Sequence, residues 1–395
     1  MVGAGIAGAV AAWHLARRGA GPVTLFDREA QPGGHSTARN AAILRTAIPD
    51  PVLHRLASAS MDFYLAPPAG FSAVPLVDPV GVLLAAPAAH ADALLTWTRD
   101  PSCARGGREV DPRAVQEAHP YVGAGIAAAV SFDAEGVLDV DAILQAYLRG
   151  ARAAGAELRS ACAVEALDLA EDGSLRGLRT AEGDFPADAV VLAGGGWAAQ
   201  PAAAAGLPLP LVPHRRHLMV TPPDARIDAR APVVWLQGEE FYFRPESGGM
   251  LMSACDHVPV TPADGERADA AVLETIAAKA ACWLPGLEDA AAAHFWAGMR
   301  TFAASDQRFV VGPDPRLAGL HWAAGLGGHG ITCGHAVGAL AAALLLDPQG
   351  SEASGEPAAA LAPARLLTAD GAATGRATAS RPTAARRAAT PRRPS

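Results

Sequence analysis

The chain has 395 residues, of which 50% are apolar and 18% are charged, and its net charge is −8. This length favours two domains, and no apolar run approaches the roughly 20 residues that a membrane-spanning helix needs. The negative charge argues against a nucleic-acid partner. The five cysteines are widely spaced and odd in number. This pattern predicts free thiols in the cytoplasm, with neither a disulfide framework nor a metal site.

The N-terminal segment carries a dinucleotide-binding fingerprint. The run VGAGIAG contains Gly3, Gly5 and Gly8, and Asp27 closes the apolar run VTLFD. Glycines at this spacing permit a tight turn, close approach of a pyrophosphate and close packing of a helix on a strand. The acidic residue can accept hydrogen bonds from a ribose. A helix over 6–18 would then present its N-terminal amides to the phosphates.

Only Met1 and Val2 remain of the strand that should precede this fingerprint, so we expect the natural start to lie a few residues upstream. A strand over 23–27 follows the helix. Residues 48–130 are irregular and rich in proline and glycine, which suggests that a second domain is inserted here. A helix is expected from Val140, and a continuous apolar strand ends at three glycines from Gly194, as in a buried parallel strand.

The C-terminal half contains a second sheet-forming segment and a second glycine turn. Residues 205–302 alternate in polarity and contain aromatic pairs, which is typical of an antiparallel sheet. A strand LHWAAG then leads into the turn GLGGHG over 325–330 and an Ala/Leu-rich helix. Beyond residue 350 the chain becomes rich in Ala, Pro, Ser, Thr and Arg, and we expect 351–395 to be a disordered tail.

Two glycine turns at opposite ends of the chain, with an aromatic-bearing sheet between them, resemble the D-amino-acid oxidase (DAO) family of FAD-dependent oxidoreductases. The resemblance rests on GAGIAG, REAQPGGHSTARNAA, FDAEGVLDVDAILQAYLRGA, VVLAGGGW, FYFRP, WAGMRTF and GLGGHGI. Within the family the pattern is most similar to bacterial D-arginine dehydrogenases. It implies an α/β fold in which a Rossmann-like FAD-binding domain carries an inserted α+β substrate domain built on an antiparallel sheet. The FAD-binding domain is expected over 1–47, 137–204 and 303–350, and the substrate domain over 48–136 and 205–302.

The second glycine turn suits a flavin, because it crowds backbone amides at the start of the final helix. The partial positive charge there would stabilise the negative edge of a reduced flavin. No cysteine lies between Arg300 and this turn, so the FAD is expected to be bound non-covalently. The fingerprint and the resemblance together place these residues along the FAD: Gly3, Gly5, Ile6, Ala7, Gly8, Asp27, Arg28, Ser36, Thr37, Arg39, Asn40, Ala41, Ala42, Val164, Gly195, Gly327, Gly330 and Ile331.

The substrate carboxylate is expected on arginine. Arg300 in WAGMRTF can clamp a carboxylate bidentately. The resemblance places Arg216 and Tyr242 on the same group, although the neighbouring Arg215 could replace Arg216. It also implies that the Gly328 carbonyl meets the substrate amine. His329 would lie at the flavin edge, either orienting water or packed in the turn.

Three positions depart from the pattern of D-arginine dehydrogenases. Where those enzymes carry polar or acidic substrate contacts, this chain has Ile43, Ile48 and Val82. A buried cationic side chain without a carboxylate partner costs several kcal/mol. We therefore expect little activity on D-arginine or D-lysine, and a preference for a small or apolar D-amino acid or a secondary amine.

The sequence thus predicts an enzyme, an FAD-dependent amino-acid dehydrogenase or oxidase. Hydride would pass from the substrate Cα to flavin N5, and the imino acid would hydrolyse to a 2-oxo acid. Oxygen or a quinone would be the electron acceptor, and no stable membrane insertion is expected. Two alternatives stay open: a 2-hydroxy-acid dehydrogenase of the same fold, with His329 as its candidate base, and a flavin-binding subunit or degenerate paralogue without turnover of its own.

Overall fold

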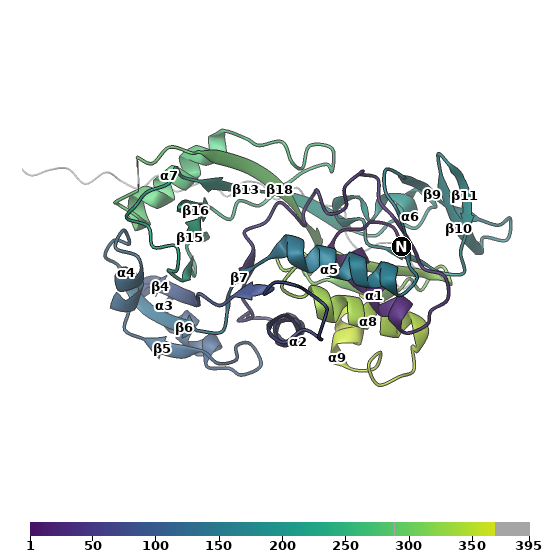
Figure 1. Cartoon of the computed structure of the whole chain (residues 1–395), viewed down its shortest axis with the longest axis horizontal. Helices are drawn as coiled ribbons and strands as arrows, with labels where there is room; N and C mark the ends of the chain where they lie inside the picture. The colour runs from purple at the N-terminus through teal and green to yellow at the C-terminus, as the bar shows by residue number, and fades with distance from the viewer. Residues whose placement is uncertain (288, 368–395) are drawn as a thin grey trace, which may run out of the picture.

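The computed structural model describes residues 1–287 and 289–367. The chain folds into two lobes, which lie side by side along the long axis of the molecule (Figure 1). The part of the predicted tail over 368–395 lies outside the described residues. None of the helices in the described ranges has the length and apolar character needed to cross a membrane.

The first lobe is built on a mainly parallel sheet, whose strands come from both the N-terminal and the C-terminal parts of the chain. Val2 forms parallel bridges to Phe26 and Leu192 and so joins two halves of the sheet. One half pairs β1 (Thr24–Phe26) with β8 (Glu157–Arg159), and the other has the order β12 (Val190–Leu192), β20 (Leu320–Ala324), β19 (Val310–Pro313). Only β19 runs antiparallel to its neighbour. The sequence therefore predicted the parallel core of this lobe correctly.

Three helices cover one face of this sheet: α1 (Ile6–Arg17), α5 (Val140–Ala153) and α8 (Gly334–Leu346). Helices α1 and α8 approach closely, since a Cβ on Gly338 would lie 2.3 Å from a Val10 methyl. The other face carries a three-stranded antiparallel sheet of β9 (Val164–Leu169), β10 (Leu175–Thr180) and β11 (Gly183–Pro186). Short elements complete the connection to β13: η1 (Gly195–Trp197) and α6 (Gln200–Ala204).

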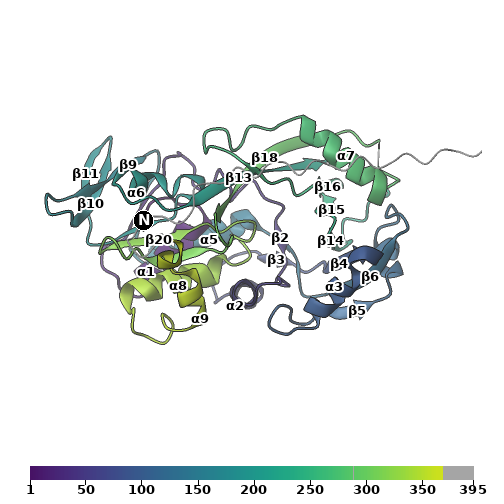
Figure 2. The ribbon, with the colours of Figure 1, turned by 180° about the vertical axis from the view of Figure 1, so that it is seen from behind.

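The second lobe is built on a nine-stranded sheet within the described residues. It is antiparallel except where β14 pairs with β4. Its long strands β13 and β18 pair over ten residues and extend from this lobe to η1 of the first (Figure 2). The strands are β4 (Val82–Pro87), β5 (Arg108–Val110), β6 (Ile126–Phe132), β13 (Leu211–Val220), β14 (Val233–Leu236), β15 (Phe241–Glu246), β16 (Gly249–Ser253), β17 (Val258–Pro259) and β18 (His294–Ala303).

Helices α3 (Ala88–Thr98), α4 (Arg113–Ala118) and α7 (Ala271–Trp283) flank this sheet. A small antiparallel sheet lies where the lobes meet and has the order β2 (Ile43–Leu44), β7 (Gly136–Leu138), β3 (Val77–Asp78). The mixed α/β architecture predicted from the sequence is confirmed, with an α+β second lobe inserted through two separate segments.

Helix α2 (Pro51–Leu65) corrects the prediction that residues 48–130 are irregular. Asp50 caps this helix by accepting hydrogen bonds from the Val52 and Leu53 amides at 2.9 and 3.2 Å, and Pro51 fits the first helical position. Its buried face packs against α8 of the first lobe. Helix α2 therefore belongs by packing to the first lobe, although the predicted boundary placed it in the substrate domain.

Residues 351–367 also differ from the prediction, because they are folded and are not part of a disordered tail. They form α9 (Glu356–Leu361) and η2 (Pro363–Leu366). Leu361 and Leu366 are fully buried, and Arg365 pairs with Asp306 at 2.7 Å. Two buried leucines and this ion pair are enough to fix a segment whose composition alone resembled a linker.

Two largely buried histidines, His14 of α1 and His335 of α8, predict acid sensitivity of the fold. Burial lowers the pKa of His14 to about 3 and that of His335 to about 4. The unfolded chain protonates these two histidines below about pH 6.5 while the folded chain keeps them neutral, so stability is lost as the pH falls from 6.5 towards 4. We expect the unfolding free energy to fall by an amount on the order of 2 kcal/mol per histidine. Chemical denaturation of wild type and His335→Gln at pH 7 and pH 5 measures this, with exposed His294→Gln as the control. An equal loss in all three proteins would contradict the assignment.

Candidate active site

One elongated cavity of about 770 Å³ runs between the two lobes and is lined by segments from both. This volume is typical of sites for cofactors and ligands of that size class. One end is formed by Asp27, Arg28 and Val164, and the other, here called the substrate end, by Arg216, Tyr242, Arg300, Gly328 and His329. Residues far apart in the sequence therefore form one continuous site.

The fingerprint forms the turn that the sequence predicts. Gly3 has φ +100°, and a Cβ on it would lie 2.7 Å from the Ala193 carbonyl oxygen. The Asp27 carboxylate accepts hydrogen bonds from the Ala4 amide at 2.8 Å and the Glu29 amide at 2.9 Å. At the N-terminus of α1, the Ile6 amide donates to Thr37 Oγ1, while Gly5 and Ala7 line the cavity. First-turn amides lack intrahelical partners, so this end is suited to a phosphate.

The loop over 36–42 follows the cavity towards the substrate end. Asn40 fixes its shape, because the side chain donates to the Thr37 carbonyl and accepts from the Ala42 amide at 2.6 Å. Ala42 has φ +54°, a backbone conformation in which a small residue is least strained. Ser36, Thr37, Asn40, Ala41 and Ala42 all line the cavity. The loop thus presents small side chains where a planar ring could approach.

The second glycine turn closes the cavity beside the substrate end. Gly327, Gly328, His329, Gly330 and Ile331 line it. The helix behind them, α8, starts at Gly334, and the residues before it form successive turns in which the Cys333 amide donates to the His329 carbonyl. Cys333 is buried and its thiol is free. Tyr64 of α2 holds this turn by donating to the Ile331 carbonyl at 2.9 Å.

Arg300 lies in the middle of β18, where it reaches the cavity and is buried. It donates to the Met299 and Arg39 carbonyls at 2.9 and 2.8 Å and forms no ion pair with any described residue. Burial, with a smaller contribution from the nearby Arg216, lowers the pKa of Arg300 to about 10. A buried guanidinium that lacks an acidic partner is suited to bind a carboxylate ligand.

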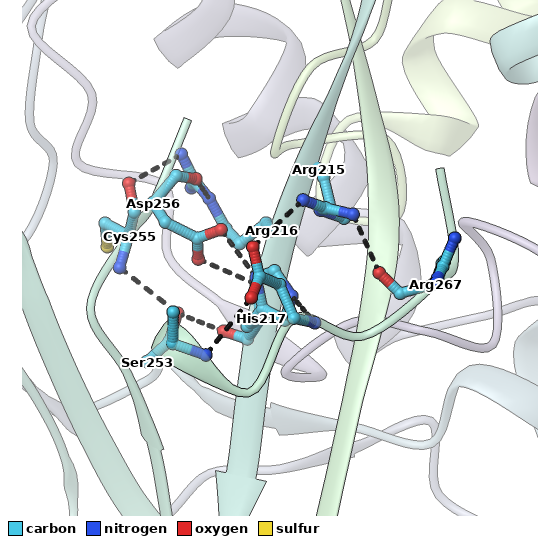
Figure 3. Close-up of polar contacts among 9 residues, drawn as sticks. Arg215, Arg216, His217, Ser253, Cys255, Asp256 and Arg267 are labelled. Carbon is cyan, nitrogen blue, oxygen red and sulfur yellow. Dashed lines mark hydrogen bonds and ion pairs between the residues drawn. The ribbon is translucent and has the colours of Figure 1, made fainter. Parts of the chain in front are cut away.

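Arg216 and Arg215 are neighbours on β13 and therefore point to opposite faces of the sheet. Arg215 donates to the Arg267 carbonyl at 2.9 Å and lies outside the cavity. Arg216 lines the cavity and donates from Nε to the Asp256 carbonyl at 3.3 Å (Figure 3). The structure thus places Arg216, and not Arg215, at the site.

A hydrogen-bonded cluster beneath Arg216 holds the segment that supports it (Figure 3). Asp256 accepts from the His217 amide and from His217 Nδ1, both at 2.7 Å, and the Asp269 amide donates to His217 Nε2 at 2.9 Å. His217 is therefore neutral, with its proton on Nδ1. Burial raises the pKa of Asp256, but the hydrogen bonds from His217 outweigh this effect and hold the pKa below its usual value.

This cluster predicts that Asp256 positions Arg216. In Asp256→Asn, the side-chain NH2 group replaces one of the two acceptor oxygens. In one orientation this NH2 would face the His217 Nδ1 proton, and in the other it would face the His217 amide, so one hydrogen bond is lost either way. We expect kcat/KM to fall about tenfold through a raised KM, because a buried charge-assisted hydrogen bond contributes about 1.5–3 kcal/mol. Steady-state kinetics measures this, with the exposed Asp264→Asn as the matched control. A lower kcat at unchanged KM would contradict the positioning role.

Tyr242 and His329 complete the predicted substrate end. Tyr242 is buried and stacks on Trp235, with ring centroids 4.6 Å apart. Burial raises the pKa of Tyr242, so its hydroxyl remains a hydrogen-bond donor. Burial, with help from Arg45 and Arg216, lowers the pKa of His329 to about 3. His329 is therefore a weak base at neutral pH.

Besides Arg215, four residues singled out from the sequence lie off the cavity. Gly8 packs against the turn, since a Cβ there would lie 1.9 Å from the Gly3 oxygen. Arg39 is half-buried and pairs with Glu266 at 3.0 Å. Ile48 and Val82 are buried in the cores of the two lobes. Of the three apolar positions that suggested an apolar substrate pocket, only Ile43 lines the cavity.

The lining residues that the sequence did not single out include Arg45, Trp235, Glu240 and Cys255. Arg45 stood in the run AAILRTA, where a charged residue within an otherwise apolar segment was the available signal. Trp235 lies opposite Tyr242 in the β14–β15 pair, a register that the sequence could not fix.

The chain belongs to the DAO family of FAD-dependent oxidoreductases, whose family model matches residues 1–344. A glycine oxidase from Geobacillus kaustophilus is 31% identical over 60% of this chain and 59% of its own length. A glycine oxidase from Pseudomonas putida is 29% identical over 85% of this chain and 88% of its own length. The first of these alignments thus spans less than two thirds of the relative.

The solved structures agree on the fold. An L-proline dehydrogenase from P. horikoshii superposes with a TM-score of 0.81 at 21% identity, covering 92% of this chain and 96% of the other. At this identity the likeness concerns the fold alone. The resemblance to the DAO family is confirmed at family level, whereas a relation to D-arginine dehydrogenase in particular is not among these similarities.

Proposed function

We propose that the protein binds FAD non-covalently and oxidises the Cα–N bond of an amino acid or an N-substituted amino acid. The observation that carries this is the pair of cationic side chains, Arg300 and Arg216, which lie without an acidic partner among the described residues beside the flavin-side turn. Two relatives are named glycine oxidases and one similar structure is named an L-proline dehydrogenase. All three names refer to small amino acids.

The cavity fits FAD by the chemistry of its lining. Glycine backbone lines both ends, the α1 N-terminus suits a pyrophosphate, and the small residues of the loop over 36–42 leave room for a planar ring. Asp27, Arg28 and Val164 would hold the adenosine end, and Gly327, Gly330 and Ile331 the flavin end. When bound, FAD supplies the two-electron acceptor.

The side chains at the substrate end would orient the amino acid. Arg300 and Arg216 bind its carboxylate, with a hydrogen bond from Tyr242, and the Gly328 carbonyl accepts from its amine. Oxidation requires a neutral amine, which the substrate can supply by losing a proton to water. A 2-hydroxy acid has a far less acidic hydroxyl and needs a base in the site. His329, with its pKa of about 3, is poorly suited to that role, which favours an amine substrate.

The pH dependence of kcat/KM tests this assignment. Because His329 stays neutral above about pH 3, the acidic limb of the profile should follow the amine pKa of the substrate. Two amino acids with different amine pKa values should therefore give limbs that are displaced by that difference. A limb fixed at one pH for both substrates would instead indicate a titrating group of the protein and contradict the proposal.

A further inference from the structure

Arg45 is a third buried guanidinium at the substrate end, and no acidic side chain among the described residues contacts it directly, although the charges of Glu135 and Glu240 act on it from nearby. It follows β2 directly, is only 8% exposed and lines the cavity. Its Nε is buried without a hydrogen-bond partner, and the guanidinium takes part in no ion pair with a described residue. A buried charge without a directly bound counter-ion destabilises the fold, unless an anionic ligand pairs with it.

An aromatic platform orients this guanidinium. Its central carbon lies 4.2 Å from the centroid of the Trp235 ring, and Trp235 in turn stacks on Tyr242. Stacking on an aromatic face leaves the in-plane donors of an arginine available for a planar anion. Arg45 is thus held next to Tyr242, which the proposed function assigns to the substrate carboxylate.

The acidic residues near Arg45 do not occupy its donors. Glu135 uses Oε1 to accept from the Thr46 amide at 2.7 Å and from the Thr46 hydroxyl, and its Oε2 has no partner. Burial raises the pKa of Glu135 to about 7, so its negative charge is incomplete near neutral pH. Glu240 is exposed at the cavity edge and forms no ion pair with Arg45.

We propose that Arg45 binds a second anionic group of the substrate, so that the enzyme acts on amino acids carrying two acidic groups. This inference rests on the proposed function for the α-carboxylate and amine. Arg300 and Arg216 would bind one carboxylate, and Arg45 a carboxylate or phosphonate on the side chain or on the amine substituent. Such a site would also repel the cationic side chains of arginine and lysine. It replaces the apolar preference expected from Ile43, Ile48 and Val82.

Isosteric substrate pairs test the inference on the FAD-loaded enzyme. We expect kcat/KM to be at least tenfold higher for aspartate than for asparagine, and for iminodiacetate than for sarcosine, with each enantiomer tried where one exists. In Arg45→Gln this preference should fall by about 30-fold or more, as expected for the loss of one partner of a buried ion pair. Arg45→Lys should retain part of it. Exposed Arg105→Gln, which makes the same charge change, should leave the preference intact.

Binding without turnover gives a second readout. Calorimetric titration should show succinate binding more tightly to wild type than to Arg45→Gln, in which its affinity should fall to about that of propionate, whereas propionate should bind both proteins alike. Equal losses for acidic and neutral ligands in Arg45→Gln would overturn the inference and indicate a general structural or flavin-directed role. If neutral amino acids are oxidised as well as acidic ones by wild type, the inference fails while the proposed function stands. If no amino acid is oxidised but succinate binds through Arg45, the proposed function fails and the anion site stands.

Discussion

Replacing Arg300 with methionine is expected to lower kcat/KM for any amino-acid substrate by about 10³-fold. Removal of one partner of a buried, hydrogen-bonded charge pair typically costs about 2–5 kcal/mol, and 4 kcal/mol corresponds to nearly three powers of ten in rate. Arg300 also donates to the Arg39 carbonyl, so the loop beside the cavity would lose one of its supports. Stopped-flow reduction of the bound flavin by increasing substrate measures the effect on binding and on the reductive step.

The neighbouring strand offers a matched control. Arg215→Met removes an arginine that contacts Arg267 and Asp269 outside the cavity, and its kinetics should stay within about threefold of wild type. Arg300→Lys should recover only part of the activity, because an ammonium cannot make the bidentate contact. Equal effects of the Arg300 and Arg215 substitutions would show that Arg300 does not bind the carboxylate.

Replacing Gly8 with alanine is expected to abolish stable FAD retention. The added Cβ would lie 1.9 Å from the Gly3 carbonyl oxygen and 3.5 Å from the Ala193 side chain, so α1 must shift away from the turn. Overpacking of this kind costs about 1–3 kcal/mol, and the shift moves the helix N-terminus that would face the phosphates. The FAD content of purified protein after desalting, read from flavin absorbance, tests this expectation.

Gly19→Ala separates this local clash from a general effect of losing a glycine. Gly19 has φ +74°, but its Cβ would meet no atom within 4 Å. We expect Gly19→Ala to cost about 1 kcal/mol of stability and to retain FAD fully. Full FAD retention in both variants would mean that the fingerprint turn does not form the cofactor site.

The fold could be predicted from the sequence where short-range patterns decide it. The spacing of Gly3, Gly5 and Gly8 determines a tight turn, and the apolar run ending at Leu192 fits only a buried strand. Helix α2 was missed because its apolar residues are spread among Ser, Ala and His, even though Asp50 and Pro51 form a helix start that could have been recognised. The folded segment after residue 350 depends on tertiary contacts of Leu361 and Leu366, which composition does not reveal.

The site could be predicted only where a residue stands in a recognisable motif. Arg300, Tyr242 and the glycines of the second turn fall in such motifs and line the cavity. Arg45 does not, because its importance depends on the stack with Trp235 from a strand almost two hundred residues away. Val82 shows the converse error: a position matched by resemblance was assigned to the pocket, whereas its side chain packs in the core of the second lobe.

Anaerobic reduction of the FAD-loaded protein tests the central claim most directly. A panel of amino acids, N-substituted amino acids and 2-hydroxy acids is mixed with the enzyme in the absence of oxygen, and the flavin absorbance is followed. We expect bleaching by amino acids, fastest for those with a second acidic group, with a stoichiometric 2-oxo acid and free amine after hydrolysis. Bleaching by 2-hydroxy acids alone, or by no member of the panel, would contradict the account.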